Sequence, residues 1–249
     1  MELKNKTFLV TGANGGMGKA TVDLLLKENA NVAGCDIRTD TLRKYEENSN
    51  LIAFQGDLTD EKTVKDIFQK TKDRFGSIDG LANIAGIAQS AAPIDEVSLE
   101  EWHKIMDINM TMMFLTCREA SIYMKKKKQG SIVNVGSVSV TRPRPGLQSY
   151  VASKGAVEAF SKALALELAP NQINVNVLHP GPSDTEMLGR FSAEGASMDD
   201  TKKDVFENSV PLGRLLKPED IAQSIKYLLS DEANMMTGSI LHVDGGRNI

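Results

Sequence analysis

The stretch Thr11-Gly12-Ala13-Asn14-Gly15-Gly16-Met17-Gly18 decides the fold of this chain. It follows a short apolar run and leads into a segment with the apolar periodicity of a helix. Glycine permits positive φ and a close approach of ligand to backbone, and the helix that follows offers unpaired N–H groups at its positive dipole end. A glycine-rich turn between a first strand and a first helix predicts a site for the pyrophosphate of a dinucleotide, with an ordinary flexible loop as the alternative.

Apolar runs and helical stretches alternate along the rest of the chain. We expect strands at Thr7–Val10, Asn31–Cys35, Leu51–Gln55, Gly80–Asn83, Ser131–Val135, Ile173–Leu178 and Ser239–Val243. We expect helices at Gly16–Glu28, Glu61–Phe75, Glu100–Lys127, Tyr150–Leu168 and Pro218–Ser230. This alternation predicts an α/β fold, a doubly wound Rossmann-type domain whose seven-stranded parallel sheet has helices on both faces.

The chain shows no linker and no internal repeat, so we expect a single domain over residues 1–249. Residues 183–210 are polar and weakly periodic, which predicts a flap over a substrate pocket, with an ordinary surface loop as the alternative.

The composition is that of a globular protein, with 41% hydrophobic and 25% charged residues in 249 and a net charge of −4. No basic stripe predicts nucleic-acid binding, and the apolar run near the N-terminus is too short for a signal peptide or a membrane span. Cys35 and Cys117 have no metal-ligand or redox spacing, so we expect no metal and a reducing compartment. A cytoplasmic location is the resulting expectation.

A carboxylate ends the second expected strand, where the adenosine ribose of a dinucleotide is bound. Asp36 is placed to accept hydrogen bonds from the ribose hydroxyls and to repel a 2′-phosphate. Ile37 follows it, and Gly15 stands where a basic side chain would help to hold that phosphate. Arg38 and Lys19 argue in the opposite direction. On balance we predict NAD, with NADP as the less favoured alternative.

Tyr150 and Lys154 lie four residues apart on a predicted helix and therefore share one face. A neighbouring ammonium group stabilises a phenolate and lowers its pKa, although this spacing is also common on ordinary amphipathic helices. Ser137 follows the fifth expected strand, at the sheet edge where ligands bind, and its hydroxyl can hold a substrate oxygen. Asn109 is polar within an apolar helix, so it either anchors a water linked to Lys154 or satisfies a local backbone group.

Taken in order, these residues resemble the short-chain dehydrogenase/reductase family over nearly the whole chain. The resemblance places the Asn, Ser, Tyr and Lys of the family's tetrad on Asn109, Ser137, Tyr150 and Lys154. The cofactor residues that the notable motifs and the resemblance imply are Gly12, Asn14, Gly16, Met17, Gly18, Asp36, Ile37, Asp57, Leu58, Asn83, Ala85, Gly86, Tyr150, Lys154, Pro180, Gly181, Ser183 and Thr185. Two departures, Ile84 and Ser183, replace an Asn and a branched aliphatic residue.

The resemblance implies an enzyme that interconverts a secondary alcohol and a ketone by hydride transfer, with Tyr150 as acid and base. Ser137 then positions the substrate oxygen, Lys154 holds the nicotinamide ribose and lowers the pKa of Tyr150, and Asn109 anchors a water-linked proton path. The alternatives are an NADP-dependent 3-oxoacyl-thioester reductase and a non-catalytic dinucleotide sensor. The family also implies a homotetramer, with contacts through the Tyr150 helix and the C-terminal strand.

The substrate, a small-molecule alcohol or ketone, is not identified by these motifs. We expect pocket residues from 89–93, 139–148 and 188–206. Arg142, Arg144 and Arg190 in or near these segments either meet a substrate carboxylate or phosphate or are simply solvated. His103 and His179 are expected to be structural.

Overall fold

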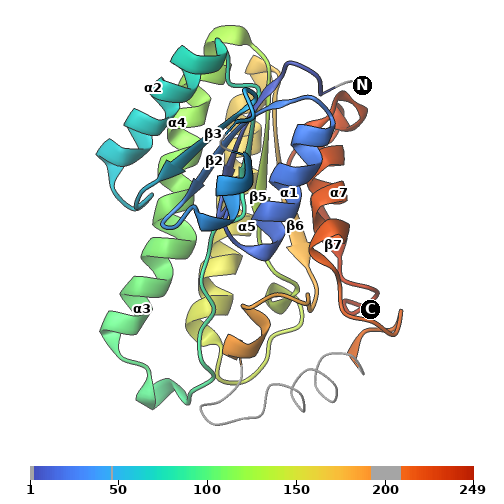
Figure 1. Cartoon of the computed structure of the whole chain (residues 1–249). Helices are drawn as coiled ribbons and strands as arrows, with labels where there is room; N and C mark the ends of the chain where they lie inside the picture. Colours follow the sequence, from blue (N-terminus) through green and yellow to red (C-terminus); the bar gives the residue numbers. More distant parts are fainter. Residues whose placement is uncertain (1–2, 46, 192–208) are drawn as a thin grey trace.

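A parallel sheet organises the computed structural model, which describes residues 3–45, 47–191 and 209–249. In this described part, seven strands pair in the order β3-β2-β1-β4-β5-β6-β7 (Figure 1). The strands are β1 (Thr7–Thr11), β2 (Asn31–Asp36), β3 (Leu51–Gln55), β4 (Gly80–Asn83), β5 (Gly130–Val135), β6 (Ile173–Pro180) and β7 (Ile240–Val243). All six strand pairs are parallel, so the predicted fold class is confirmed.

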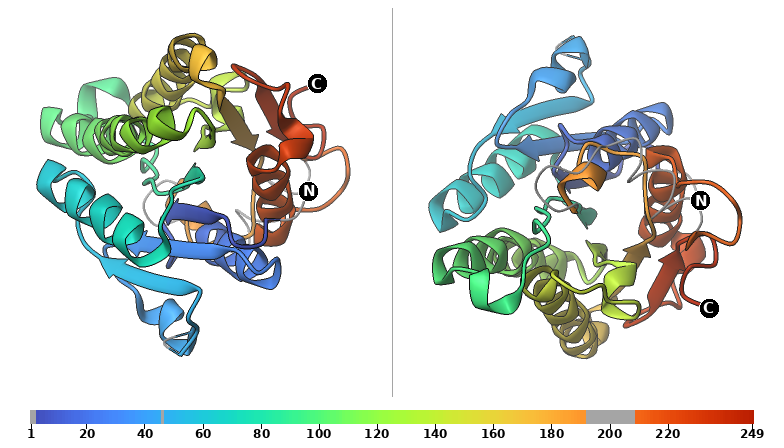
Figure 2. Two further views of the ribbon diagram at one scale, coloured as in Figure 1. Left: turned by 90° about the horizontal axis from the view of Figure 1, so that it is seen from above. Right: turned by 90° about the horizontal axis from the view of Figure 1, so that it is seen from below.

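Helices cover both faces of the sheet. On one face, α1 (Gly16–Lys27) packs beside α7 (Pro218–Leu229), and on the other lie α2 (Glu61–Phe75), α4 (Met112–Lys127) and α5 (Gln148–Leu168) (Figures 1 and 2). Each layer has its own apolar core, one around Phe68 and Leu81 and one around Phe8 and Ile225. The central strands are buried between the two layers, as their continuous apolar runs require.

Local signals explain where several helices begin and end. The carboxylate of Asp60 accepts a hydrogen bond from Thr63 N (2.7 Å) at the start of α2, and Gly76, with φ +81°, ends that helix. Helix α7 begins at Pro218, and Asp220 accepts from Lys217 N (2.8 Å) in its first turn.

The expected helix Glu100–Lys127 is the main error of the element prediction. The structure has α3 (Leu99–Met106), a π-helical turn (Asp107–Thr111) and then α4. A π turn inserts one extra residue without interrupting the apolar pattern, so periodicity alone does not detect it. Short 3-10 turns such as η1 (Asp40–Tyr45), η4 (Val138–Val140) and η6 (Leu188–Phe191) were also not predicted.

The strand order of the sheet changes direction between β1 and β4. Strands β2 and β3 lie on one side of β1, and the later strands lie on the other. Thr11 at the end of β1 is paired with Asn83 at the end of β4, so both loops that follow leave from the same edge. Ligands of doubly wound sheets bind at such a point. Among the described helices, none is both long enough and apolar enough to cross a membrane.

Candidate active site

The glycine turn after β1 is folded tightly against its surroundings. Gly12 has φ +67°, and a Cβ added there would lie 2.8 Å from the Ala85 backbone. A Cβ on Gly18 would lie 2.0 Å from Gly12 O, so a side chain at either position would displace backbone. No side chain caps the first turn of α1, and no acidic residue lies in it. The turn and the open helix N-terminus therefore fit the pyrophosphate of a dinucleotide.

Asp36 lies at the end of β2 beside this turn. Its Oδ2 accepts a hydrogen bond from Asn14 N (3.0 Å), and its Oδ1 accepts one from Arg38 N (3.1 Å). The amide oxygen of Asn14 accepts from Thr41 N (2.8 Å), so Asn14 joins the glycine turn to η1 rather than pointing freely to a ligand. Ile37 is exposed beyond the strand. The carboxylate thus lies where the sequence predicted contact with the ribose.

Three other predicted cofactor residues use their side chains within the fold. The side chain of Asp57 accepts from Thr59 N (2.8 Å) within its own turn, and Leu58 is buried in the core. Asn83 is also buried, and its side chain bonds Asn134 Oδ1 (2.9 Å) and Thr116 Oγ1 (2.8 Å). These side chains stabilise the sheet edge, and none of the three lines the large cavity described below.

The segment after β6 crosses above the glycine turn. A Cβ on Gly16 would lie 3.1 Å from Thr185 Cγ2, which places this segment over the N-terminus of α1. Gly181 packs so closely on Asp244 that a Cβ would lie 2.6 Å from its Cα. The hydroxyl of Ser183 donates to Gly181 O (3.0 Å), and Ser183 forms an isolated bridge with Leu216. The predicted nicotinamide segment is therefore held rigidly beside the predicted phosphate turn.

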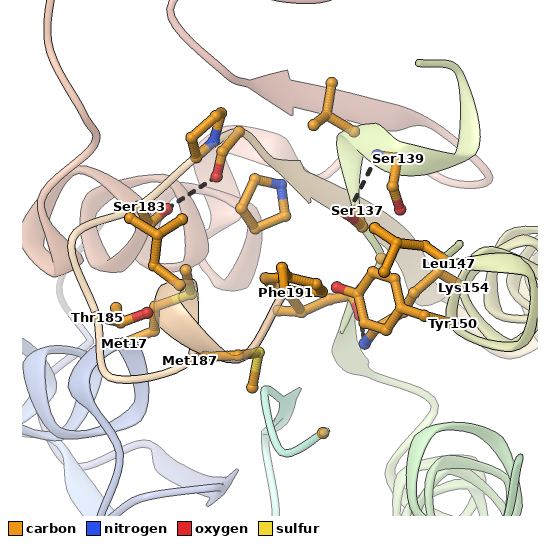
Figure 3. Close-up of a pocket in the computed structure, with 18 of the residues that line it drawn as sticks. Met17, Ser137, Ser139, Leu147, Tyr150, Lys154, Ser183, Thr185, Met187 and Phe191 are labelled. Carbon is orange, nitrogen blue, oxygen red and sulfur yellow. Dashed lines mark hydrogen bonds between the residues drawn. The ribbon is translucent and has the colours of Figure 1, made fainter. Parts of the chain in front are cut away.

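A mainly apolar cavity opens between this segment and α5 (Figure 3). The predicted site residues that line it are Met17, Gly86, Ser137, Tyr150, Lys154, Pro180, Gly181, Ser183 and Thr185. The predicted site residues outside its lining are Gly12, Asn14, Gly16, Gly18, Asp36, Ile37, Asp57, Leu58, Asn83, Ala85 and Asn109. His103, His179 and Arg190 do not line it either. The structure thus separates a reaction cavity from the predicted adenosine end.

Tyr150 and Ser137 meet in this cavity. Tyr150 is 6% exposed, and its ring lies edge to face with Phe191, with 5.0 Å between centroids (Figure 3). Burial raises the pKa of the Tyr150 phenol, and hydrogen bonding with the Ser137 hydroxyl acts in the opposite direction. The phenol of Tyr150 is therefore neutral at pH 7, whereas the sequence analysis expected the neighbouring ammonium to lower its pKa.

Lys154 extends beneath the Tyr150 ring. Its Nζ donates to Val135 O (2.9 Å) and lies 6.0 Å from the ring centroid. Burial lowers the pKa of this ammonium to about 8. At pH 7 the group is still mainly protonated, so the cavity holds a positive charge one helical turn from the phenol.

Asn109 lies in the π turn and is completely buried. Its Oδ1 accepts from Ile87 N (2.8 Å), and its Nδ2 donates to Ile87 O (3.1 Å) and to Ser153 Oγ (3.0 Å). The Ser153 hydroxyl in turn donates to Tyr150 O (2.7 Å). The Asn109 side chain therefore satisfies backbone groups, which is the second of the two expectations. The water relay stays a prediction.

Sequence reasoning placed Gln89 and Phe191 in expected pocket segments without giving them a role, and it missed Arg247. Gln89 is fully buried, and its Oε1 accepts from Tyr150 N (3.0 Å), which fixes the first turn of α5. Phe191 and Arg247 line the cavity. No short-range pattern marks these contacts, because only the fold brings the three residues to the Tyr150 region.

Comparisons with known proteins agree with this geometry. The family model described as enoyl-(acyl carrier protein) reductase matches residues 12–248. A 3-oxoacyl-[acyl-carrier-protein] reductase of Thermotoga maritima is 34% identical over 99% of each chain. A 2,5-dichloro-2,5-cyclohexadiene-1,4-diol dehydrogenase of Sphingobium indicum is 38% identical over 98% of each. The crystal structure of a 3-ketoacyl-(acyl-carrier-protein) reductase of Brucella melitensis complexed with NADH is 34% identical, with a TM-score of 0.91 over 99% of this chain and 100% of that one.

The fold and these matches define an oxidoreductase that binds a nicotinamide dinucleotide and acts on CH–OH groups or the corresponding ketones. By their names, the three relatives act on a hydroxyl or a keto group. The chain belongs to the short-chain dehydrogenase/reductase family. The resemblance found in the sequence is confirmed.

Proposed function

We propose that this chain is an NAD(H)-dependent enzyme that interconverts a secondary alcohol and a ketone, with Tyr150 as the proton-transferring residue. The observation that carries the proposal is the convergence of Tyr150, Ser137 and Lys154 in one cavity beside the glycine turn. A nicotinamide ring held by Pro180–Thr185 supplies or accepts the hydride when the cofactor is bound.

In the reductive direction Tyr150 donates its phenolic proton to the substrate oxygen. Ser137 hydrogen-bonds the same oxygen and stabilises the charge that develops on it. Burial keeps the phenol protonated before reaction, which suits the donor role. The Lys154 ammonium then stabilises the phenolate that remains, and solvent returns the proton. Oxidation of an alcohol follows the reverse path, with the phenolate as base.

The NAD preference rests on Asp36. Its carboxylate repels a 2′-phosphate at the end of β2, and no basic residue occupies the adjacent glycine turn. Of the two opposing cations, Lys19 is paired with Asp23 (2.8 Å), which neutralises it. Arg38 is exposed, so it offers only a solvated charge.

The preference is tested by steady-state rates with NADH and NADPH. We expect Asp36→Ala to lower kcat/KM for NADH by about tenfold and to raise it for NADPH, because a charged hydrogen-bond acceptor and a repulsive charge are both removed. Asp40→Ala is the matched control, since Asp40 makes only an exposed ion pair with Arg43. Equal losses with both cofactors would contradict the proposed role of Asp36.

An NADP-dependent 3-oxoacyl-thioester reductase is the second candidate. The relatives from Thermotoga maritima and Brucella melitensis are named as 3-oxoacyl- and 3-ketoacyl-carrier-protein reductases, and the second is complexed with NADH. Asp36 argues against NADP but not against the thioester. A panel of hydroxy acids, sugars, polyols, steroids and 3-oxoacyl thioesters, followed at the nicotinamide absorbance band, separates the candidates. Turnover of thioesters with NADPH in preference to NADH would favour the second.

We also propose that residues 183–210 form a substrate-binding flap on the single domain. Residues 192–208 lie outside the described part of the chain. Within the described part, Met187, Leu188 and Phe191 line the cavity, which supports the proposal. Phe191 covers one edge of the Tyr150 ring, so a substrate that reaches the phenol must displace it or pack on it.

Assembly into a homotetramer is a further part of the proposal, implied by the family. Helices α4 and α5 expose Phe114, Ile122 and Leu166, the last at 81%. The two helices are joined by a contact between the rings of Phe114 and Phe160 and by a surface ion pair. Strand β7 lies at an edge of the sheet and pairs only with β6 in the described chain. These apolar helices and this open edge support contacts between copies.

A further inference from the structure

Three arginines line the reaction cavity. Arg142 and Arg144 lie in the loop between Ser137 and Tyr150, and Arg247 comes from the C-terminal segment after β7. Ser137 and Tyr150 line the same cavity, so the three arginines and the proposed proton donor border one space. Two segments about a hundred residues apart in sequence therefore place positively charged side chains at this cavity.

Arg142 and Arg247 are not explained by ion pairs, since neither forms a salt bridge with any described carboxylate. The guanidinium of Arg247 donates one long hydrogen bond, to Ser209 O (3.5 Å). The carboxylate of Asp244 accepts from Gly246 N (2.9 Å) and Asn248 N (2.9 Å). Burial lowers the pKa of Arg247, the charges of Arg144 and Arg142 lower it further, and the charge of Asp244 raises it. The repulsion between the arginines is a cost that a bound anion would offset.

We propose that Arg142, Arg144 and Arg247 bind an anionic group of the substrate, a carboxylate or a phosphate, while the reacting carbonyl lies against Ser137 and Tyr150. This inference rests on the proposed function and narrows its substrate class. Guanidinium groups present planar pairs of donors that match both oxyanions, and a partly buried setting strengthens such bonds. The apolar remainder of the cavity holds the carbon skeleton.

Arg74 provides an internal comparison. It is exposed at the end of α2, outside the cavity and outside residues 183–210, and its guanidinium donates to Ser49 O (3.2 Å). Arg142 is also exposed, so the feature that distinguishes it from Arg74 is that it lines the cavity. Substitution of Arg142 or Arg247 is therefore expected to change substrate use, whereas the same substitution of Arg74 is not.

The anion has two chemical sources, a carboxylate on a small keto acid or a phosphate on a carrier thioester. Three probes share one 3-oxobutanoyl group and distinguish these sources: acetoacetate, acetoacetyl-coenzyme A and neutral ethyl acetoacetate. Each is supplied with NADH to the wild-type chain and to Arg142→Gln, Arg247→Gln and Arg74→Gln. Preference for the first or the second probe identifies the carboxylate or the phosphate.

We expect at least one charged probe to exceed ethyl acetoacetate in kcat/KM by about tenfold or more. Arg142→Gln and Arg247→Gln should lower that kcat/KM by about tenfold through KM, with ethyl acetoacetate nearly unchanged, because a charge-assisted hydrogen bond is lost. Arg74→Gln should match the wild type. Added salt should raise KM for the charged probe only, since it screens the attraction.

The unfolding temperature with saturating NADH and each probe provides a readout that does not depend on turnover. A charged probe should raise it in the wild type and in Arg74→Gln, and not in the Arg142→Gln/Arg247→Gln double variant. Stabilisation of this kind without turnover supports the anion site and counts against the proposed reaction. Equal kcat/KM and equal stabilisation by charged and neutral probes, or equal losses in all three variants, would overturn the anion site and leave the reaction standing.

Discussion

Lys154 carries its ammonium group into the interior of the protein, where it bonds Val135 O and lowers the stability of the fold. Its pKa falls from the usual 10.5 to about 8 because burial disfavours the charged form. Between these two values the unfolded chain binds more protons than the folded chain, so stability rises with pH across that window. Below pH 8 the full cost of burying the charge is present. A residue kept at such a cost is expected to have a functional role.

Lys154→Met should therefore abolish turnover and stabilise the fold. We expect the free energy of unfolding at pH 7 to rise by about 1–3 kcal/mol, because the buried charge is removed while an apolar stem of similar length remains. The gain should shrink as the pH rises from 8 towards 10.5. Urea unfolding at several pH values measures it.

Lys162→Met is the control on the same helix, since Lys162 is exposed and pairs with Glu158. Its stability should change little at any pH. A Lys154→Met variant that is less stable than the wild type at pH 7, or that retains turnover, would show that the burial cost or the functional role is assigned wrongly.

The motif residues could be predicted because they lie close together in sequence or follow strands that end at one edge. Tyr150 and Lys154 are one helical turn apart, and Ser137 follows β5. Gln89 and Phe191 fell within the expected pocket segments, but their contacts with Tyr150 could not be predicted, because these contacts depend on loops. Arg247 was not predicted at all, for the same reason. The sequence analysis also predicted Asn83 as a cofactor-binding residue, whereas its side chain bonds Asn134 in the interior.

The π turn between α3 and α4 positions the loop that follows β4. Asn109 bonds both backbone groups of Ile87, and Gln89, two residues further on, accepts from Tyr150 N. The turn therefore fixes the Tyr150 helix through this loop. Periodicity predicted a continuous helix here, because the extra residue of a π turn leaves the flanking apolar pattern intact. The strands were predicted to within two residues at their ends, since buried parallel strands are continuous apolar runs.

Asn109→Ala should impair both folding and turnover. It leaves the N–H and C=O of Ile87 without partners, which is expected to lower the free energy of unfolding by about 2–4 kcal/mol. It also loosens the loop that holds Tyr150, so kcat should fall more than KM changes. Urea unfolding and steady-state rates measure the two effects. Thr111→Ala, an exposed substitution in the same turn, should change neither. Lost turnover with unchanged stability would instead favour the water relay.

The whole molecule presents apolar side chains on α4 and α5 that a monomer leaves in water. Leu166→Glu places a charge among these exposed apolar side chains and should dissociate the proposed homotetramer to smaller species. Light scattering coupled to gel filtration measures the mass. Lys62→Glu, at an exposed position of α2, a helix that carries none of these side chains, is the control. A wild-type chain that elutes as a monomer would contradict the proposed assembly.

The sheet order explains why one cavity can hold both a dinucleotide and a substrate. Strands β1 and β4 place the glycine turn and the Ala85–Gly86 loop together, while β5 and β6 deliver Ser137 and the Pro180–Thr185 segment to the same edge. The alternation of strands and helices predicted a doubly wound parallel sheet, and this strand order belongs to that class. The pairing of the C-terminal strand with β6 also carries Arg247 to the cavity.

The proton-transferring role of Tyr150 is tested most directly by Tyr150→Phe, which removes one oxygen and retains the ring that packs on Phe191. Fluorescence titration gives the Kd for NADH, and the panel substrate with the highest activity gives kcat. We predict an NADH Kd within about twofold of the wild type and a kcat lower by about a thousandfold, because the proton donor is lost while the cofactor site is intact. Turnover within about tenfold of the wild type would contradict the role assigned to Tyr150.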